Sequence, residues 1–241
     1  MAASKLYLVT GASSGIGRAV CERLLEDGHT VAGIARDFSK FSKKHPEFHP
    51  VTLDLAALDA LPDALGELSK RFASIDGLVC CAGRGQFGSL EEFSYEQIRA
   101  LMDLNFTSQA YAARAFLPGM KQRHRGDIIF IGSEAALSGG RKGAVYSASK
   151  FALRGLAQAL REECAKSGVR ISIINPGMVK TDFFKSLNFS HGEDTDNYVL
   201  PEDVAAAAAM ILAARPGTVF DEINLSPLKK VVHFVKTTKD Q

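Results

Sequence analysis

The sequence predicts an α/β protein whose parallel sheet is covered by helices on both faces. Short, almost continuously apolar runs such as 30–35 and 127–131 alternate along the chain with longer segments of helical periodicity. This alternation is typical of parallel sheets, because each crossover between parallel strands needs a long connection, usually a helix. The pattern opens over residues 5–26 with a strand, a glycine-rich turn and a helix. Since the chain contains no internal repeat and no linker, we expect one domain over residues 1–241.

The expected elements follow one another closely. The strands are 6–9, 30–35, 51–54, 75–81, 127–131, 169–174 and 220–225, and the helices are 16–26, 61–72, 95–120, 145–166 and 202–214. Pro118-Gly119 is expected to end the third helix, and Asn175-Pro176-Gly177 to stop the sixth strand. Residues 180–200 lack periodicity and indicate a loop, in which we place a substrate lid at 182–200. Residues 226–241 form a C-terminal tail after the last strand.

Composition excludes several classes of protein. With 46% hydrophobic and 23% charged residues, the chain has the make-up of a soluble globular protein. A net charge of +2 is too small to indicate binding to nucleic acid or to a membrane surface. No apolar run approaches the roughly 20 residues of a membrane helix, and the first strand begins too early for a signal peptide.

Cysteine and histidine usage indicates a reducing compartment and no metal site. The cysteines, Cys21, Cys80, Cys81 and Cys164, include no C-x-x-C pair, so we expect buried, reduced thiols and a cytoplasmic protein. The six histidines have no ligand spacing, which argues against a catalytic metal.

The glycine-rich turn is a candidate phosphate site. Gly11, Gly15 and Gly17 lie between the first strand and the first helix, where backbone N–H groups and a helix N-terminus can approach a phosphate. Their spacing, Gly-x-x-x-Gly-x-Gly, differs from the common dinucleotide spacing Gly-x-Gly-x-x-Gly, and no P-loop Lys-Ser/Thr pair follows. Taken alone, the turn leaves a nucleotide site and an ordinary strand-to-helix turn both open.

Four polar residues are candidates for chemistry. Tyr146 and Lys150 lie at i and i+4 of a predicted helix, and an ammonium near a phenol makes the phenol easier to ionise. The alternative is a Tyr–Lys pair on a solvated face. Ser133 follows the fifth strand at the edge where open parallel sheets bind ligands, although a turn serine is an alternative there. Asn105, a poor helix former, lies within the third helix and can disturb its backbone bonding.

Taken together, these motifs resemble those of the short-chain dehydrogenase/reductase family. They are Thr10-Gly-Ala-Ser-Ser-Gly-Ile-Gly17, Asn105, Ser133, Tyr146-x-x-x-Lys150 and Asn175-Pro-Gly177, with Tyr146 thirteen positions after Ser133. The resemblance covers residues 5 to 225. It implies a single-domain Rossmann-type, doubly wound sheet of about seven parallel strands. It also implies hydride transfer between a nicotinamide and a carbonyl or alcohol carbon.

The same resemblance implies roles for individual residues. Tyr146 is the general acid in reduction and the base in oxidation, and Lys150 lowers its pKa and binds the nicotinamide ribose. Ser133 polarises the carbonyl, and Asn105 holds a water that connects Lys150 to solvent. The implied cofactor-binding residues are Gly11, Ser13, Ser14, Gly15, Ile16, Gly17, Arg36, Asp54, Leu55, Cys81, Ala82, Gly83, Tyr146, Lys150, Pro176, Gly177, Val179 and Thr181.

One position departs from the family's pattern. The family usually has Asn-Asn-Ala-Gly after the fourth strand, where this chain has Cys80-Cys81-Ala82-Gly83. Because cysteine is a weak hydrogen-bonding residue, we expect a weaker cofactor contact at position 81 and unchanged backbone contacts at Ala82 and Gly83.

Charge after the second strand indicates which cofactor is used. An acid at the strand end would bind the ribose 2′-hydroxyl of NAD, but this chain has Ala35 and then Arg36. A guanidinium suits a 2′-phosphate, and Ser13 can add a hydrogen bond. We therefore predict NADP(H) in preference to NAD(H). The alternative, a solvated loop arginine, is favoured slightly by the neighbouring Asp37.

The substrate is the least defined feature. We expect a carbonyl compound or secondary alcohol, with short hydroxy acids, aldehydes, keto sugars and acyl-thioester ketones as candidates. Arg141-Lys142 either favours an anionic substrate or forms a solvated loop. Two other functions stay open, an epimerase or dehydratase on the same fold and a non-enzymatic nucleotide-binding module. From the resemblance we also expect a homo-oligomer, a dimer or tetramer, with helices 95–117 and 145–166 as contact faces.

Overall fold

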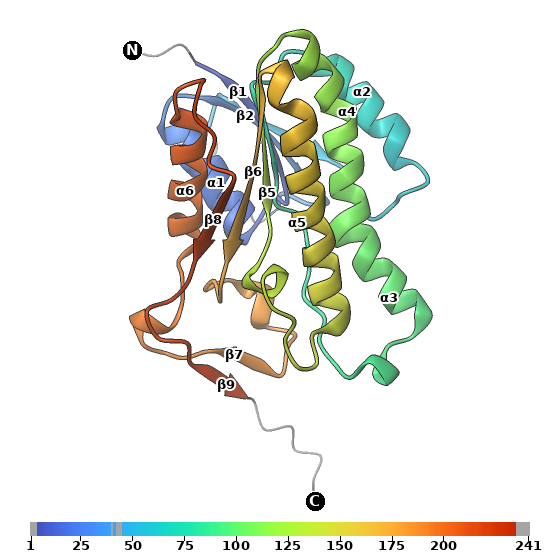
Figure 1. Ribbon diagram of the computed structural model, residues 1–241, viewed down its shortest axis with the longest axis vertical. Coiled ribbons are helices and arrows are strands. Elements are labelled where there is room, and N and C mark those ends of the chain that lie inside the picture. Colours follow the sequence, from blue (N-terminus) through green and yellow to red (C-terminus); the bar gives the residue numbers. More distant parts are fainter. Residues whose placement is uncertain (1–3, 40, 42–44, 235–241) are drawn as a thin grey trace, which may run out of the picture.

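A seven-stranded parallel sheet forms the centre of the computed structural model, which describes residues 4–39, 41 and 45–234 (Figure 1). Its strands are β1 (Leu6–Thr10), β2 (Thr30–Ala35), β3 (Phe48–Thr52), β4 (Gly77–Cys80), β5 (Gly126–Ile131), β6 (Val169–Pro176) and β8 (Glu222–Leu225). The order across the sheet is β3-β2-β1-β4-β5-β6-β8. The order reverses between β1 and β4, the point at which open parallel sheets bind ligands outside the carboxyl ends of their strands.

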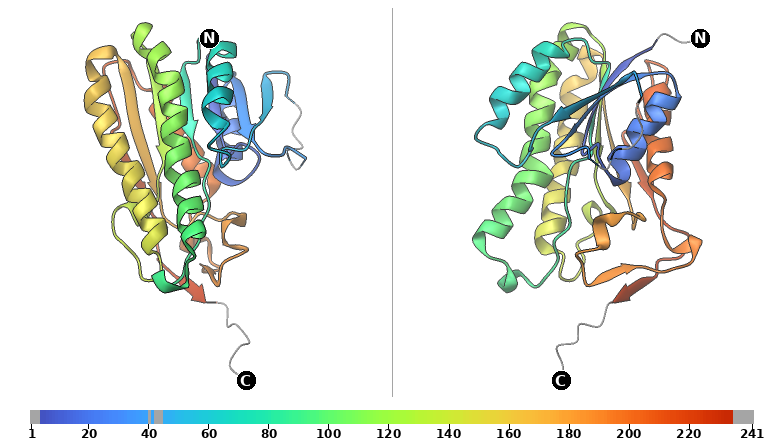
Figure 2. Two further views of the ribbon diagram at one scale, coloured as in Figure 1. Left: turned by 90° about the vertical axis from the view of Figure 1, so that its right-hand side faces the viewer. Right: turned by 180° about the vertical axis from the view of Figure 1, so that it is seen from behind.

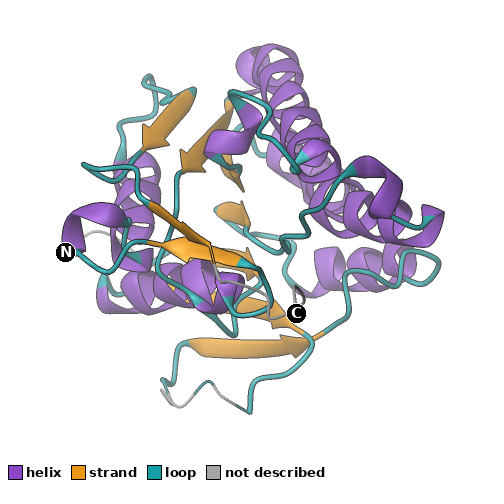
Figure 3. Ribbon diagram, turned by 90° about the horizontal axis from the view of Figure 1, so that it is seen from below, coloured by secondary structure: helices purple, strands orange, loops and turns teal. Residues whose placement is uncertain are grey.

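Helices cover both faces of this sheet, which confirms the predicted fold class. They are α1 (Gly15–Glu26), α2 (Leu61–Arg71), α3 (Tyr95–Met102), α4 (Ser108–Gln122), α5 (Ala144–Cys164) and α6 (Pro201–Ala213). Helices α1 and α6 pack on one face, and α2, α4 and α5 on the other (Figures 1 and 3). Leu24 and Leu212 are buried on the first face, and Leu65 and Leu153 on the second. Burying one such side chain stabilises the fold by about 1.5–3 kcal/mol.

Among the strands that differ from their predicted bounds, β3 and β6 do so because of their pairing. Strand β3 covers 48–52 instead of 51–54 and pairs only with β2, so Pro50 is tolerated on an edge strand. Strand β6 continues through Asn175 and Pro176, which pair with Asn224 and Leu225 of β8. The prediction that Asn175-Pro176-Gly177 stops this strand at 174 was therefore wrong by two residues.

The predicted helix 95–120 is divided into three parts. A π-helical turn, Asp103–Thr107, separates α3 from α4. The helix then runs through Pro118 to Gln122, so the prediction that Pro118-Gly119 ends it was wrong. Phe116 and Met120, on either side of the proline, are both buried. This packing keeps the last turn helical although Pro118 donates no backbone hydrogen bond.

The segment predicted as an irregular loop at 180–200 contains short regular elements. They are two 3₁₀ turns, Asp182–Phe184 and Thr195–Asn197, and strand β7 (Phe189–His191). Strand β7 pairs antiparallel with β9 (Val232–Phe234), which lies in the predicted tail (Figure 2). Sequence periodicity missed this pairing because the two strands lie far apart in the chain. The rest of the predicted tail, 235–241, lies outside the described residues.

Two further observations concern the helices and the cysteines. None of the helices in the described part of the chain is long and apolar enough to cross a membrane. All four cysteines are free thiols, and three are buried as predicted. Cys81 is only half-buried, because it lines the cavity at the sheet edge.

Candidate active site

A cavity of about 520 Å³ opens at the carboxyl edge of the sheet. This edge faces down in Figure 1 and towards the viewer in Figure 3. Ten of the predicted site residues line the cavity: Ile16, Cys81, Gly83, Ser133, Tyr146, Lys150, Pro176, Gly177, Val179 and Thr181. The others lie next to it or along the same edge: Gly11, Ser13, Ser14, Gly15, Gly17, Arg36, Asp54, Leu55, Ala82 and Asn105. The topology therefore brings the loops after β1, β2, β3, β4, β5 and β6 to one edge of the sheet.

The glycine-rich turn after β1 has room only for glycine at key positions. Gly11 and Gly15 have φ values of +67° and +52°, which side-chain-bearing residues rarely adopt. A Cβ on Gly17 would lie 2.3 Å from the backbone oxygen of Gly11. Ser14, the N-cap of α1, makes no side-chain capping bond. The turn thus presents backbone at close range and an uncapped helix N-terminus, which fits a phosphate group.

A buried pair of polar side chains ties this turn to the chain after β4. Thr10 Oγ1 accepts hydrogen bonds from the backbone N–H groups of Cys81 (2.9 Å) and Ala82 (3.0 Å). Gln109 Nε2 donates to the carbonyl of Ala82 at 2.7 Å, and the Thr10 hydroxyl lies 3.4 Å from Gln109 Oε1. The sequence reasoning did not identify Gln109. Its only sequence signal is its position one helical turn after Asn105.

Asn105 lies in the π-helical turn and is fully buried. Its Oδ1 accepts from the N–H of Arg84 (2.9 Å), and its Nδ2 donates to the carbonyl of Arg84 (3.0 Å) and to the Ser149 hydroxyl (3.2 Å). The expected disturbance of the helix at Asn105 is therefore present, and π-turns are frequent at functional sites. The Asn105 amide thereby fixes the chain at Arg84 beside α5. Ser149 Oγ donates a hydrogen bond to the Tyr146 carbonyl at 2.7 Å, and the sequence did not identify Ser149 as a site residue.

Tyr146 is buried within the cavity wall on the first turn of α5. Burial raises the pKa of Tyr146 to about 12, and a hydrogen bond with the Ser133 hydroxyl opposes this only in part. The pKa shift expected from Lys150 was in the opposite direction. The effect of Lys150 does not outweigh burial here, because its ammonium lies 5.9 Å from the centre of the tyrosine ring and donates its hydrogen bond to the Ile131 carbonyl. The phenol therefore stays protonated at neutral pH.

Lys150 is a buried ammonium one turn further along α5. Its Nζ donates to the carbonyl of Ile131 at 3.0 Å, at the end of β5. Burial lowers the pKa of Lys150 to about 8, with a small opposing effect of the Cys81 thiol. A Cβ on Gly83 would lie 3.7 Å from Nζ, so the chain after β4 passes directly beside the ammonium.

Ser133 follows β5 and caps a short 3₁₀ turn, Glu134–Ala136. Its Oγ accepts from the N–H of Ala135 at 3.2 Å, which fixes the oxygen at the cavity wall. This N–H fills one acceptor site of the Ser133 hydroxyl, and a hydrogen bond links the same hydroxyl to Tyr146.

Arg36 and Asp54 lie at the β2–β3 side of the same edge. They follow Ala35 and Thr52, which are paired neighbours on the two strands. Arg36 is exposed, and Asp54 Oδ1 accepts from the N–H of Ala56 at 3.0 Å, which holds its loop in a turn. Leu55 is buried beneath that loop. These residues are separated from the cavity by the glycine turn, as an extended ligand lying along the edge requires.

Within residues 4–39, 41 and 45–234, no group of three or more His, Cys, Asp or Glu side chains is arranged to hold a metal ion.

The sheet order, the glycine turn and the clustered Ser133, Tyr146 and Lys150 define a nucleotide-binding oxidoreductase class. A family model described as short chain dehydrogenase matches residues 5–191. The chain belongs to this family, and it is an oxidoreductase of that kind.

Individual relatives cover nearly the whole chain. An uncharacterized oxidoreductase of Staphylococcus saprophyticus is 31% identical over 232 residues, which cover 93% of this chain and 97% of the relative. A sepiapterin reductase of Chlorobaculum tepidum is 30% identical and covers 92% of this chain and 96% of its own length. Among solved structures, an alcohol dehydrogenase from the archaeon Thermococcus sibiricus, complexed with 5-hydroxy-NADP, superposes with a TM-score of 0.84. It is 26% identical, and the match covers 95% of this chain and 99% of that one.

Proposed function

We propose that the protein is an NADP(H)-dependent oxidoreductase that interconverts a carbonyl compound and the corresponding alcohol, with reduction as the working direction. The observation that carries this proposal is the convergence of Ser133, Tyr146 and Lys150 on one cavity at the sheet edge. A bound nicotinamide supplies or takes up the hydride. The residues of the chain supply the proton and hold the oxygen.

Tyr146 is the general acid in reduction and the general base in oxidation. A pKa of about 12 keeps the phenol protonated, the form that gives a proton to the carbonyl oxygen. The Ser133 hydroxyl holds that oxygen by a hydrogen bond. The positive charge of Lys150 stabilises the phenolate that forms when the proton leaves, and its Nζ also binds the nicotinamide ribose hydroxyls.

A bound cofactor would lie along the sheet edge. The glycine turn, with Ser13, Ser14 and Ile16, would hold its phosphates. Asp54 and Leu55 would bind the adenine end, and Pro176, Gly177, Val179 and Thr181 the nicotinamide end. Cys81, Ala82 and Gly83 would contact the ribose. Asn105 holds this last segment and thereby positions it beside Lys150.

Cofactor preference depends on Arg36. An exposed guanidinium after β2, with no acid at the strand end, is suited to a 2′-phosphate. The NADP-type ligand of the Thermococcus relative supports this choice. Charge-assisted hydrogen bonds contribute about 1.5–3 kcal/mol, so Arg36→Ala should weaken NADPH binding by about tenfold or more and leave NADH binding unchanged. Titration of cofactor fluorescence measures both. Equal loss for NADH and NADPH, or none for either, would contradict the role given to Arg36.

The test of the function is an initial-rate survey. Carbonyl and hydroxyl compounds are offered with NADPH or NADP⁺, and cofactor absorbance is followed. We expect carbonyl reduction with NADPH at rates well above those with NADH. If no compound changes the absorbance with either cofactor, the proposed function fails.

We further propose a cytoplasmic homo-oligomer that binds neither nucleic acid nor a membrane. The four free cysteine thiols support a reducing compartment such as the cytoplasm. Tyr111 on α4 and Phe151 on α5 are exposed aromatic side chains, and they support a homo-oligomer in which these two helices form the contact faces.

A further inference from the structure

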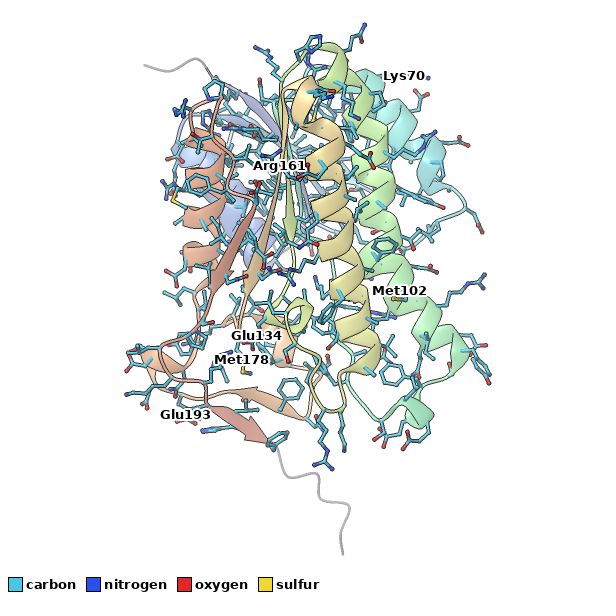
Figure 4. All side chains as sticks on the ribbon, in the orientation of Figure 1. Lys70, Met102, Glu134, Arg161, Met178 and Glu193 are labelled. Carbon is cyan, nitrogen blue, oxygen red and sulfur yellow. The ribbon has the colours of Figure 1, made fainter. Side chains whose placement is uncertain are left out.

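Aromatic side chains gather on the substrate side of the cavity. The residues assigned to the cofactor form one wall, at the ends of β1, β4 and β6. The other lining residues include the rings of Phe87, Phe183, Phe184 and Phe189, which we call the aromatic wall. Leu137, Met178 and Val232 are further apolar residues of the lining. Figure 4 shows Met178 and Glu134 at the lower end of the sheet, just above β7.

The aromatic wall begins at the catalytic tyrosine itself. The ring centre of Phe87 lies 5.0 Å from that of Tyr146, and the ring centre of Phe183 lies 6.0 Å from it. Phe189 continues the wall, 4.9 Å from Phe87 and nearly perpendicular to it. A carbonyl bonded to Tyr146 would therefore place its own substituent directly against these rings.

The backbone provides the space for these rings. A Cβ on Gly85 would lie 2.3 Å from Phe183 Cζ and 3.0 Å from Phe87 Cε2. Glycine at position 85 thus lets two rings from distant segments meet over the active site. The aromatic wall therefore depends on the phenylalanine side chains and on the glycine at position 85.

The charges around the cavity do not suit a substrate with a carboxylate next to its carbonyl. Among the described lining residues, the cations besides Lys150 are Arg84, Arg141 and Lys230. Arg84 and Arg141 are exposed. Lys230 Nζ is paired with Glu134 Oε2 at 2.7 Å. Within the described part of the chain, Lys150 is thus the buried cation of the cavity lining, and the other three are exposed or paired with Glu134.

We propose that the group bonded to the reacting carbonyl carbon is an aromatic ring, so that the substrates are aryl aldehydes and aryl ketones. This proposal rests on the proposed function. In the reaction the carbonyl carbon gains a hydride, its oxygen gains the Tyr146 proton, and NADPH is oxidised to NADP⁺. Edge-to-face and offset contacts with Phe87, Phe183 and Phe189 then select a flat ring over a small or polar substituent.

The test compares benzaldehyde with propanal as substrates of the wild type, Phe183→Leu and Phe189→Leu. We expect the ratio of kcat/KM for benzaldehyde to that for propanal to fall by about tenfold or more in both variants. Tyr95→Leu, a change of a ring that is 88% exposed and outside the cavity, is the matched control and should keep the wild-type ratio. Unfolding curves confirm that each variant is folded.

A binding measurement gives a second readout that needs no turnover. Acetophenone is titrated into the protein with NADP⁺, and we expect saturable binding that weakens by about tenfold in Phe189→Leu. An unchanged rate ratio in both leucine variants, or no saturable binding to the wild type, overturns the aryl assignment. If propanal and the other carbonyls are also not reduced, the proposed function fails instead.

Discussion

The two walls of the cavity are built in different ways. The wall proposed to hold the cofactor and the catalytic residues is fixed by hydrogen bonds of buried polar side chains, such as those of Thr10 with the chain after β4 and of Asn105 with Arg84. The substrate wall is closed by β7, β9 and surface ion pairs, among them Lys229–Asp196, with both side chains largely exposed. Buried polar networks hold one geometry, whereas exposed ion pairs add little. The proposed catalytic and cofactor residues are therefore fixed by a hydrogen-bond network, and the proposed substrate-binding residues lie on loops whose ion pairs are exposed.

The largest expected effect on stability is at the wall proposed to hold the cofactor. Gly17→Ala places a Cβ against the backbone oxygen of Gly11, which cannot move away without distorting the turn. We expect the free energy of unfolding to fall by about 3 kcal/mol and NADPH affinity to fall by about tenfold or more. Urea unfolding and fluorescence titration measure the two effects.

The matched control is Gly66→Ala in α2, where an added Cβ meets nothing within 4 Å. It should stabilise the protein by about 0.5–1 kcal/mol, because alanine favours the helix, and leave cofactor binding unchanged. Equal effects of the two substitutions would remove the argument for a tight turn at Gly17.

The pH dependence of reduction tests the electrostatics of the same wall. The pKa of Lys150 is lowered to about 8, so its ammonium loses its proton as the pH rises above that value. If the charge stabilises the phenolate, kcat/KM should fall by about tenfold per pH unit above pH 8. Tyr146, with a pKa of about 12, contributes nothing to this limb.

Lys150→Arg provides the control for the pH profile. Arginine stays protonated throughout, so the decline above pH 8 should disappear, although the activity is lower. A wild-type profile that is flat from pH 7 to 10 would show that the charge of Lys150 has no part in the reaction.

The smallest effect is expected at the substrate wall. Lys230→Ala removes the pair with Glu134, in which both side chains are partly exposed (64% and 35%). Its contribution to stability should be less than about 1 kcal/mol, and NADPH affinity should not change. A loss of cofactor binding in Lys230→Ala would mean that the two walls are coupled, contrary to the comparison made above.

The fold could be predicted almost completely from the sequence. Apolar strands and amphipathic helices give local patterns, and most of the predicted bounds were within two residues of those observed. The exceptions depend on contacts between distant segments. Strand β6 is extended by its partner β8, and β7 exists because β9 pairs with it. Strand β8 was itself predicted at 220–225, but its pairing with β6, like the pairing of β9 with β7, cannot be read from the local sequence.

The residues of the candidate site are likewise of two kinds, those in local sequence motifs and those defined by contacts between distant segments. Ser133, Tyr146 and Lys150 lie in motifs with fixed spacing, and the topology brings them into one cavity. Gln109 and Phe87 carry no such motif and became visible only through their contacts. The direction of the Tyr146 pKa was mispredicted because spacing reports the distance to Lys150 but not the burial of the phenol.

The most direct test of the account is Tyr146→Phe, which removes only the phenolic oxygen. A general acid contributes on the order of 10²–10⁴-fold to a rate, so kcat for carbonyl reduction should fall by that factor. NADPH binding, measured by fluorescence, should stay within about twofold of the wild type, because the glycine turn and Arg36 are untouched. A variant that binds NADPH and reduces carbonyls at the wild-type rate would contradict the account.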